Sequence, residues 1–301
     1  MPLCIAKSLI LTAMAAMAVA APAQKLELNA GVTTCSTLED VDDAPHGSGS
    51  VAKLSGKFDF FISRSADEAG RPIIWTGTVR TAYGHLSNHG EAAELYPDEM
   101  FDASVNVSHV RPLAGKWSMM ISAGIGVYSD LDRLSGRNLL ANGAAVFVYR
   151  VNRSLDVGGG IGLTNAYGVP MVLPMPFLRW ATGGKFELKI NMIGRASVTG
   201  AMRLNERARL NFDFLSVESM SAITRIDGKY KVFGVTSDRS AIRPEYQLGK
   251  ATVHLAVGCT WRRSMRLTNR SFKDFFYSFN HKRRYTHRPA LWLEAGYSIA
   301  F

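Results

Sequence analysis

Cysteine is scarce in this sequence of 301 residues, which contains only three. Cys4 lies near the amino terminus, whereas Cys35 and Cys259 are far apart along the chain. Small disulfide-stapled folds need several cysteine pairs, so that class of protein is excluded. The strands predicted below place Cys35 and Cys259 two strands apart, which disfavours a bridge between them.

Long apolar runs are missing after residue 23, and a helix needs about 20 apolar residues to cross a bilayer. Before that point the pattern is typical of an export signal. Lys7 is positive, residues 9–19 are apolar, and Ala21-Pro22-Ala23 fits the small-x-small cleavage rule. An amino-terminal membrane helix would need a longer apolar run. We therefore predict a cleaved signal peptide over residues 1–23 and one barrel domain over residues 24–301.

Acidic residues are outnumbered, because 25 Asp and Glu face 35 Lys and Arg, which gives a formal charge of +10. A basic balance suits anionic partners such as nucleic acid, lipopolysaccharide phosphates or acidic solutes. Export argues against nucleic acid. The histidines and carboxylates show no metal-ligand spacing, and no phosphate-binding glycine loop is present. We therefore expect no metal and no cofactor.

Alternation of apolar residues with small or polar residues recurs many times along the chain. Within 116–128, the odd positions from Trp117 to Val127 are apolar, and the even positions from Ser118 to Gly126 are mostly small or polar. A soluble sandwich alternates too, but its strands are usually about 5–6 residues long. These segments match the ~9–11 residues of a tilted membrane strand. The pattern predicts an all-β fold, a transmembrane antiparallel β-barrel with lipid-facing apolar residues.

Short turns that carry Asn or Gly, such as those at 113–116 and 204–207, alternate with longer connections at 87–99, 129–138, 166–171, 218–240 and 264–286. This alternation is typical of the periplasmic and extracellular ends of a barrel. It predicts fourteen strands, which are 25–34, 53–64, 73–86, 100–110, 116–128, 139–150, 153–165, 172–181, 185–192, 195–203, 207–217, 241–248, 251–263 and 288–301. The even number places both termini on the periplasmic side. The patterns at 25–34, 195–203 and 241–248 are weaker, and twelve strands is the alternative count.

Tryptophans mark both ends of the predicted strands. Trp75, Trp117 and Trp180 lie near the short turns, and Trp261 and Trp292 lie toward the opposite ends. This arrangement is typical of two interfacial girdles.

The last strand ends the chain on an aromatic residue. Phe301, Ile299 and Tyr297 share one apolar face, and Ser298 and Gly296 lie on the other. This pattern resembles the carboxyl-terminal assembly signal of outer-membrane proteins. We therefore expect the barrel-assembly machinery and the outer-membrane lipids as partners.

Several segments together resemble a family of uncharacterised outer-membrane barrels common in Bacteroidota. They are Gly126-Val127-Tyr128-Ser129-Asp130, Tyr167-Gly168-Val169-Pro170-Met171-Val172-Leu173-Pro174, Trp180 and Arg203-Leu204-Asn205-Glu206-Arg207. The resemblance covers roughly residues 54–301. It implies the fold and the outer-membrane location but no activity, because its motifs are turns and strands. The basic stretch 262–288 departs from the family pattern.

One short motif suggests chemistry. His85, Ser87 and Asn88 match the His-x-Ser-Asn signature of outer-membrane lipid hydrolases, and Glu99 lies twelve positions after the serine. Ser87 would attack, His85 would act as base, and Glu99 would orient the imidazole. His and Ser are also ordinary residues at a strand end near lipid headgroups. The motif has no companion signature and lies early in the chain, so we expect no enzymatic activity.

A basic and aromatic stretch follows the thirteenth predicted strand. Its candidate ligands for anions or lipopolysaccharide are Arg262, Arg263, Arg266, Arg270, Lys282, Arg283 and Arg284. Such a loop could bind lipopolysaccharide phosphates, or fold inward and make a pore prefer anions. A solvated basic loop is the plain alternative.

The sequence therefore predicts an outer-membrane barrel that is a passive or weakly selective channel, or a structural barrel. A lipid hydrolase and a surface-binding barrel that grips lipopolysaccharide are the alternatives. Fourteen strands would leave a lumen, unlike the filled interior of eight-stranded barrels. Whether that lumen is open depends on the predicted loops 218–240 and 264–286.

Overall fold

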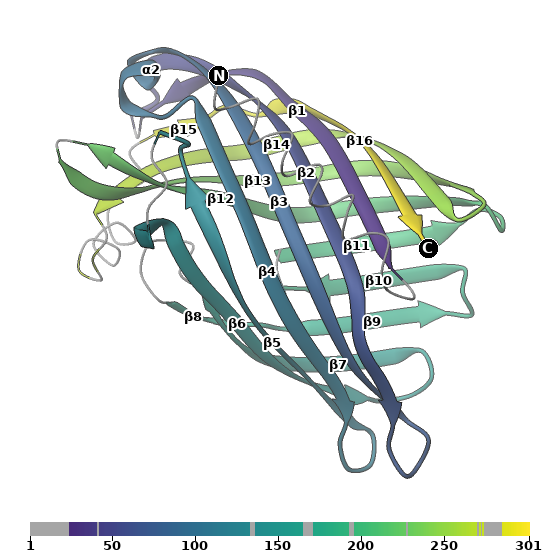
Figure 1. The fold of residues 1–301 in the computed structure, drawn as a ribbon. Helices are drawn as coiled ribbons and strands as arrows, with labels where there is room; N and C mark the ends of the chain where they lie inside the picture. The colour runs from purple at the N-terminus through teal and green to yellow at the C-terminus, as the bar shows by residue number, and fades with distance from the viewer. Residues whose placement is uncertain are drawn as a thin grey trace.

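The computed structural model describes residues 24–40, 42–132, 136–164, 171–192, 196–226, 228–269, 271, 273 and 285–301 (Figure 1). The predicted signal peptide lies outside the described residues. No helix in the described part has both the length and the apolar content to cross a bilayer.

Strands make up nearly all of the regular structure. They are β1 (Lys25–Glu39), β2 (Pro45–Ala66), β3 (Pro72–Gly90), β4 (Glu99–Pro112), β5 (Trp117–Ser129), β6 (Leu139–Arg150), β7 (Leu155–Thr164), β8 (Met171–Pro174), β9 (Phe177–Thr182), β10 (Phe186–Asn191), β11 (Ala196–Arg203), β12 (Ala208–Ile226), β13 (Lys229–Leu248), β14 (Ala251–Asn269), β15 (Tyr285–His287) and β16 (Ala290–Ala300). A short helix, α2 (Glu91–Leu95), follows β3, and a 3-10 turn, η1 (Gly136–Asn138), precedes β6.

These strands close into one antiparallel ring. β16 pairs with β14 and also with β1, from Lys25 opposite Ala300 to Thr33 opposite Trp292. β8 and β9 both pair with β7 and form two parts of one wall position, and β15 and β16 do the same beside β14. The sixteen strands therefore make a ring of fourteen positions. The predicted barrel and its count of fourteen are confirmed, and the alternative count of twelve is wrong. In Figure 1 the near wall, β1 to β7, crosses the far wall, β9 to β14, at a steep angle.

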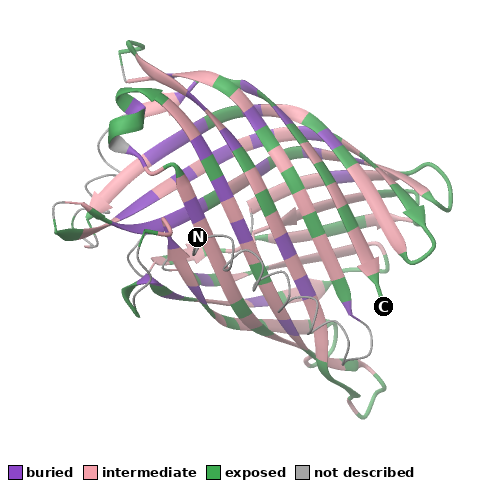
Figure 2. Ribbon diagram, turned by 45° about the horizontal axis from the view of Figure 1, so that its top comes forward, coloured by how far each residue is buried: buried purple, intermediate pink, exposed green. Residues whose placement is uncertain are grey.

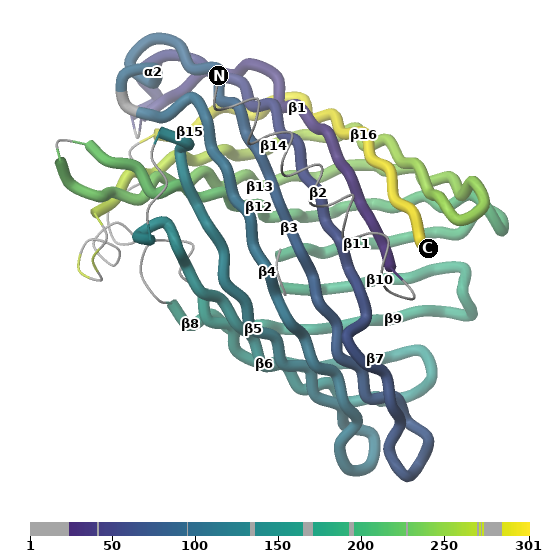
Figure 3. The backbone as a smooth tube through the Cα atoms, viewed as in Figure 1, coloured from purple at the N-terminus to yellow at the C-terminus, as the bar shows by residue number. Residues whose placement is uncertain are grey.

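The two ends of the barrel differ. The tight turns after β2, β4, β9, β11 and β13 gather at the end that also holds the carboxyl terminus, whereas α2 and the β12–β13 hairpin lie at the opposite end (Figure 3). Gly115 and Gly249 lie in two of these turns with φ of 59° and 62°. Glycine adopts this left-handed conformation without a steric penalty from Cβ, which explains the turn pattern in the sequence.

The outer surface of the wall is apolar. Exposed large side chains recur at every second residue, such as Leu255 and Val257 on β14 or Val105 and Val107 on β4. Figure 2 shows exposed and less exposed positions alternating along the near strands. In a membrane barrel the apolar residues of each strand face the lipid, and the residues between them face the lumen.

Four of the five tryptophans lie on this outer face. Trp75, Trp117, Trp180 and Trp261 are exposed, as an interfacial girdle requires. The prediction that Trp292 belongs to a girdle is wrong. Trp292 points into the lumen and is only 4% exposed, and the guanidinium of Arg239 lies over its ring at 5.0 Å. Trp292 shares a strand face with Glu294, so strand alternation itself places it inside.

The predicted outer loop 218–240 is wrong. β12 and β13 continue as a paired hairpin to Ile226 and Lys229, and β14 likewise extends to Asn269, into the predicted connection 264–286. The hairpin residues Met220 to Thr224 are all buried, so both faces of the strand pack and the apolar–polar alternation disappears. That loss of alternation is why the sequence pattern indicated a loop.

The hairpin end of β12 reaches the opposite wall. Ile223 pairs in parallel with Ser129 of β5, although β6, β7, β9, β10 and β11 separate the two strands along the ring. The side chain of Asn138 ties the contact by donating to the carbonyls of Tyr128 (3.1 Å) and Ile223 (3.2 Å). The hairpin therefore lies across the lumen rather than standing away from it.

Candidate functional site

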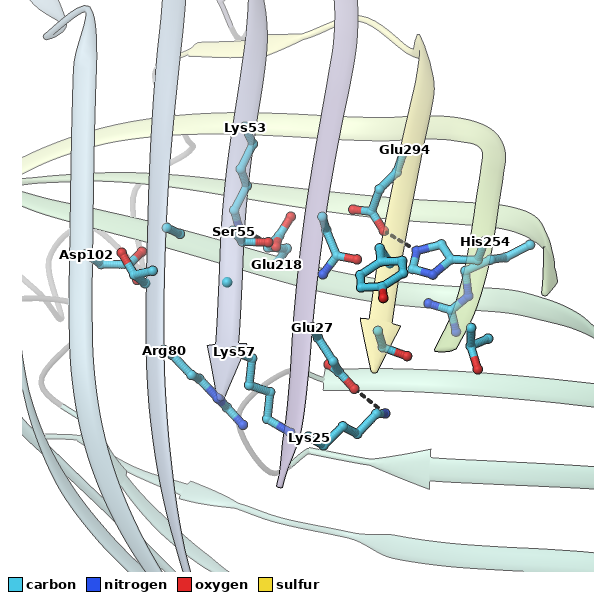
Figure 4. A pocket seen from close by; sticks show the side chains of 18 of the residues that line it. Lys25, Glu27, Lys53, Ser55, Lys57, Arg80, Asp102, Glu218, His254 and Glu294 are labelled. Atoms are coloured by element: carbon cyan, nitrogen blue, oxygen red, sulfur yellow. Dashed lines mark hydrogen bonds and ion pairs between the residues drawn. The ribbon is translucent and has the colours of Figure 1, made fainter. Parts of the chain in front are cut away.

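A cavity of about 660 Å³ lies inside the barrel, and we call it the chamber. Its walls come from β1, β2, β3, β4, β12, β13, β14 and β16 (Figure 4). The lining is mostly polar and strongly charged, and includes Lys25, Glu27, Asn29, Lys53, Ser55, Lys57, Arg80, Thr81, Asp102, Glu218, Ser219, Arg243, Glu245, Thr252, His254 and Glu294.

An ion pair crosses the lumen at one side of the chamber. Lys53 of β2 lies 2.5 Å from a carboxylate oxygen of Glu218 on β12. The other oxygen of Glu218 accepts a hydrogen bond from Arg239 of the neighbouring β13. β2 and β12 are not neighbours in the sheet, so this ion pair joins two separate parts of the wall.

An apolar layer covers the chamber on the side of α2. It contains Met220, Ala222, Phe233 and Val235 of the hairpin. They pack against residues of β1, β2, β3, α2, the α2–β4 connection, β4 and β14, namely Leu38, Val51, Ala82, Leu86, Ala92, Tyr96, Met100 and Met265. The end of the Met220 side chain sits against Gly84, where an added Cβ would lie 3.2 Å from it. The hairpin thus contributes a packed apolar plug. Glu218, which forms the ion pair, precedes Met220 of this plug by two residues on β12.

A second, smaller cavity of about 180 Å³ continues the polar interior along β10 to β13. Glu187 is its centre and pairs with Lys189 (2.9 Å), Arg209 (2.8 Å) and Arg179 (3.2 Å). Arg243 and Glu245 line both cavities. Charged residues therefore follow the lumen for much of its length, which is what a water-filled passage needs and a packed protein core avoids.

The sequence matches a family model over residues 19–300, and that family is described as a domain of unknown function, DUF6268. The chain belongs to this family. No curated protein matches the sequence. The predicted resemblance to an uncharacterised family is confirmed, whereas the distribution of that family among Bacteroidota stays a prediction.

Solved structures with a similar fold are outer-membrane barrels. The COG4313 outer membrane channel from Pseudomonas putida F1 has a TM-score of 0.50 and 10% identity, covering 94% of this chain and 97% of that chain. The toluene transporter TodX from Pseudomonas putida has a TM-score of 0.38 and 10% identity, covering 94% of this chain and 90% of that chain. At such identity the first likeness supports the fold of this DUF6268 barrel, and nothing finer.

The residues of the hydrolase motif lie near the α2 end of β3. His85 is exposed and is the direct cross-strand partner of Glu99. The carboxylate of Glu99 instead accepts a hydrogen bond of 2.5 Å from the hydroxyl of Tyr83. Within the described residues no hydrogen bond joins His85 to Ser87 or to Glu99. The three residues are close along the sheet but are not connected as a catalytic triad.

The candidate basic residues fall into three groups. Arg262 is exposed and pairs with Asp238, and Arg266 is half-buried. Arg263 is a correction, because it is only 1% exposed and donates inward to the carbonyl of Gly49 (2.6 Å) and to Nδ1 of His287 (2.8 Å). A surface role in lipopolysaccharide binding therefore does not hold for Arg263. Arg270, Lys282, Arg283 and Arg284 lie outside the described residues.

The predicted assembly residues lie on the closing strand. Tyr297 and Phe301 are exposed on the outer face, and Ile299 pairs with Leu26 of β1. The backbone N–H of Phe301 donates to the carbonyl of Gln24 (2.9 Å), so the last residue joins the seam where the ring closes. The two cysteines of the described chain, Cys35 and Cys259, are free thiols.

The chamber residues on β1, β2 and β3 were not among the sequence candidates. Lys25, Lys57 and Arg80 each lie on the polar face of a predicted strand, and that alternation is the signal that could have found them. What the sequence lacks is the register that brings them to the same height of the wall.

Proposed function

We propose that this protein is a channel of the bacterial outer membrane for small polar solutes, and that the inward β12–β13 hairpin holds its α2 end shut. The main support for this proposal is the charged chamber of about 660 Å³ inside a closed ring whose outer surface is apolar. Small barrels without a transport role fill their interior with side chains. A hydrated, charged chamber of this size supports passage instead.

The proposed location follows from the same surface. An apolar outer face, a girdle of tryptophans and an aromatic closing strand suit insertion by the barrel-assembly machinery into the outer membrane. Export through a cleaved signal at residues 1–23 and contact with lipopolysaccharide are parts of this proposal. The COG4313 protein, which has a similar fold, is itself described as an outer membrane channel. The proposal includes no enzymatic activity.

The hairpin supplies the test. In a shortened variant, residues 219–236 are replaced by a two-residue Asn-Gly turn, which joins the neighbouring pair Glu218–Ser237 without changing register. Single-channel recording of the purified full-length barrel in planar bilayers should show small or brief openings, and the shortened variant should show a larger, steadier conductance.

The matched control shortens the opposite end. Residues 67–71 are replaced by the same Asn-Gly turn, since Ala66 and Pro72 are paired there. This variant should conduct like the unaltered protein. If the hairpin variant folds, as shown by heat-modifiable migration on gels, yet passes no more current than the control, the proposed function is wrong.

A further inference from the structure

Three cationic side chains lie side by side on one wall of the chamber. Lys57 of β2 and Arg80 of β3 are direct cross-strand partners. Lys25 of β1 is two positions from Glu27, which is the direct partner of Lys57. Figure 4 shows the three side chains in one row along β1, β2 and β3. We call these three residues the cationic row.

The placement of Lys57 opposite Arg80 is unfavourable by itself. Directly opposed residues of an antiparallel pair have their Cβ atoms about 4.5–5.5 Å apart, and like charges there destabilise the sheet. A one-residue slip cannot relieve the repulsion, because it would turn every lipid-facing side chain of the strand inward. Water in the chamber screens part of this repulsion, and negative charge placed beside the two cations relieves it further.

Acidic residues of the wall form ion pairs with Lys25 and Lys57 of the cationic row, but not with Arg80. Lys25 pairs with Glu27, and Lys57 pairs with Asp59. Asp59 also accepts a hydrogen bond from Thr78 at 2.7 Å. In the described part of the chain, Arg80 makes no hydrogen bond and no ion pair. Asp102 on β4 is close enough to interact with Arg80 electrostatically but does not pair with it.

Arg80 differs in this respect from the other lysines and arginines that line the two cavities. Lys53 is held by Glu218, Arg243 lies by Asp213 and Glu245, and Lys189 and Arg209 share Glu187. Arg80 is also exposed to the chamber. Its guanidinium therefore keeps its donors free for a group that enters the lumen.

From this geometry we propose that the cationic row is a subsite for small organic oxyanions, with Arg80 as the residue that binds the carboxylate or phosphate group. The planar guanidinium presents donors in a fork that matches these groups. The ammonium groups of Lys57 and Lys25 lie beside it, each paired with a carboxylate of the wall. Because the row is hydrated, binding is weak enough for the solute to leave, as conduction requires. The inference rests on the proposed channel and names its solute class.

Binding is tested without current. Isothermal titration calorimetry of the full-length barrel in detergent, at low ionic strength, uses succinate as the carboxylate probe and inorganic phosphate as the phosphate probe. Low salt is needed because exposed charges are screened within about 10 Å at 0.1 M. Arg80→Gln should weaken binding of at least one probe by about tenfold or more, which corresponds to about 1.4 kcal/mol. Arg80→Lys should restore part of it.

The matched control is Arg111→Gln. Arg111 is exposed on the strand face of β4 that carries Val105 and Val107, so it carries the same charge on the outside of the same barrel. This variant should bind both probes like the unaltered protein. Loss of succinate binding alone assigns a carboxylate solute, and loss of phosphate binding alone assigns a phosphate solute.

The outcomes separate the two proposals. Equal affinity of the unaltered protein and Arg80→Gln, or no binding of either probe, overturns the subsite even if the barrel conducts. Binding that depends on Arg80 in a barrel that never conducts keeps the subsite and overturns the channel.

Discussion

The ion pair between Lys53 and Glu218 should act as a latch for the inward hairpin, and Glu218→Gln tests this. The two side chains are 17% and 20% exposed and lie 2.5 Å apart. At an effective dielectric constant of about 20, such a pair attracts by roughly 7 kcal/mol. Loss of hydration offsets much of this attraction.

The substitution removes the acid that both Lys53 and Arg239 share. Breaking a buried pair by removing one partner costs ~3–5 kcal/mol. Because both side chains are partly exposed, we expect the closed state to lose about 2 kcal/mol. That change multiplies the ratio of open to closed states by roughly 30, since each 1.4 kcal/mol is a factor of ten.

Single-channel recording measures that ratio directly. The control is Glu245→Gln, because Glu245 lines the same chamber but pairs with Arg243 on its own strand and joins no separate walls. In a double-mutant cycle, Lys53→Met should add little to Glu218→Gln. An open-to-closed ratio that does not change in Glu218→Gln, or rises equally in Glu245→Gln, would refute the latch.

Three further predictions concern the ends of the barrel. His46 lies between Asp40 (2.9 Å) and Glu91 (2.8 Å), and its hydrogen bonds to Asp40 and then Glu91 raise its pKa above the ordinary 6.5. This stabilisation is complete below pH 6.5 and is lost as pH rises through the raised pKa. Protection of the 91–95 amides from hydrogen exchange, corrected for the intrinsic rate at each pH, should therefore be lower at pH 9 than at pH 6, and His46→Gln should remove this difference in protection. Deletion of Phe301 should deplete the outer-membrane fraction, because the residue closes the seam with Gln24; normal heat-modifiable migration of the deletion would contradict this. Purified protein should release no fatty acid from lipid A or phospholipid. Turnover that is lost in both Ser87→Ala and His85→Ala would show instead that the motif is catalytic, since removing a nucleophile costs up to ~10⁶ in rate.

Regular strands were predictable because each one obeys a local rule. The predicted segment 116–128 became β5, Trp117–Ser129, since its outer face meets lipid and its inner face meets the lumen along the whole length. The turns followed for the same reason, because glycines such as Gly115 and Gly249 are required by backbone conformation alone.

The hairpin of β12 and β13 could not be predicted in that way. Met220 and Ile223 are buried by contacts with β3 and β5, which are distant in sequence. Such packing on both faces leaves no period of two. A strand buried on both sides and a loop of small residues have the same appearance in a single sequence.

The chamber lies between these two cases. The polar faces that carry Lys57 and Arg80 were visible in the alternation, but their juxtaposition depends on the register of β2 against β3. The pairing of Lys53 with Glu218 depends on the closure of the whole ring. Neither relation is encoded in a short segment of sequence.

Electrical recording decides whether the lumen of this barrel is a passage for ions. Single channels of the full-length protein are recorded in a planar bilayer across a gradient of potassium chloride. We expect discrete openings, and Arg80→Gln should shift the reversal potential away from that of chloride, because the substitution removes a cation from the chamber lining. A barrel that inserts but never opens, in the unaltered form or after the hairpin is shortened, would contradict the proposed channel.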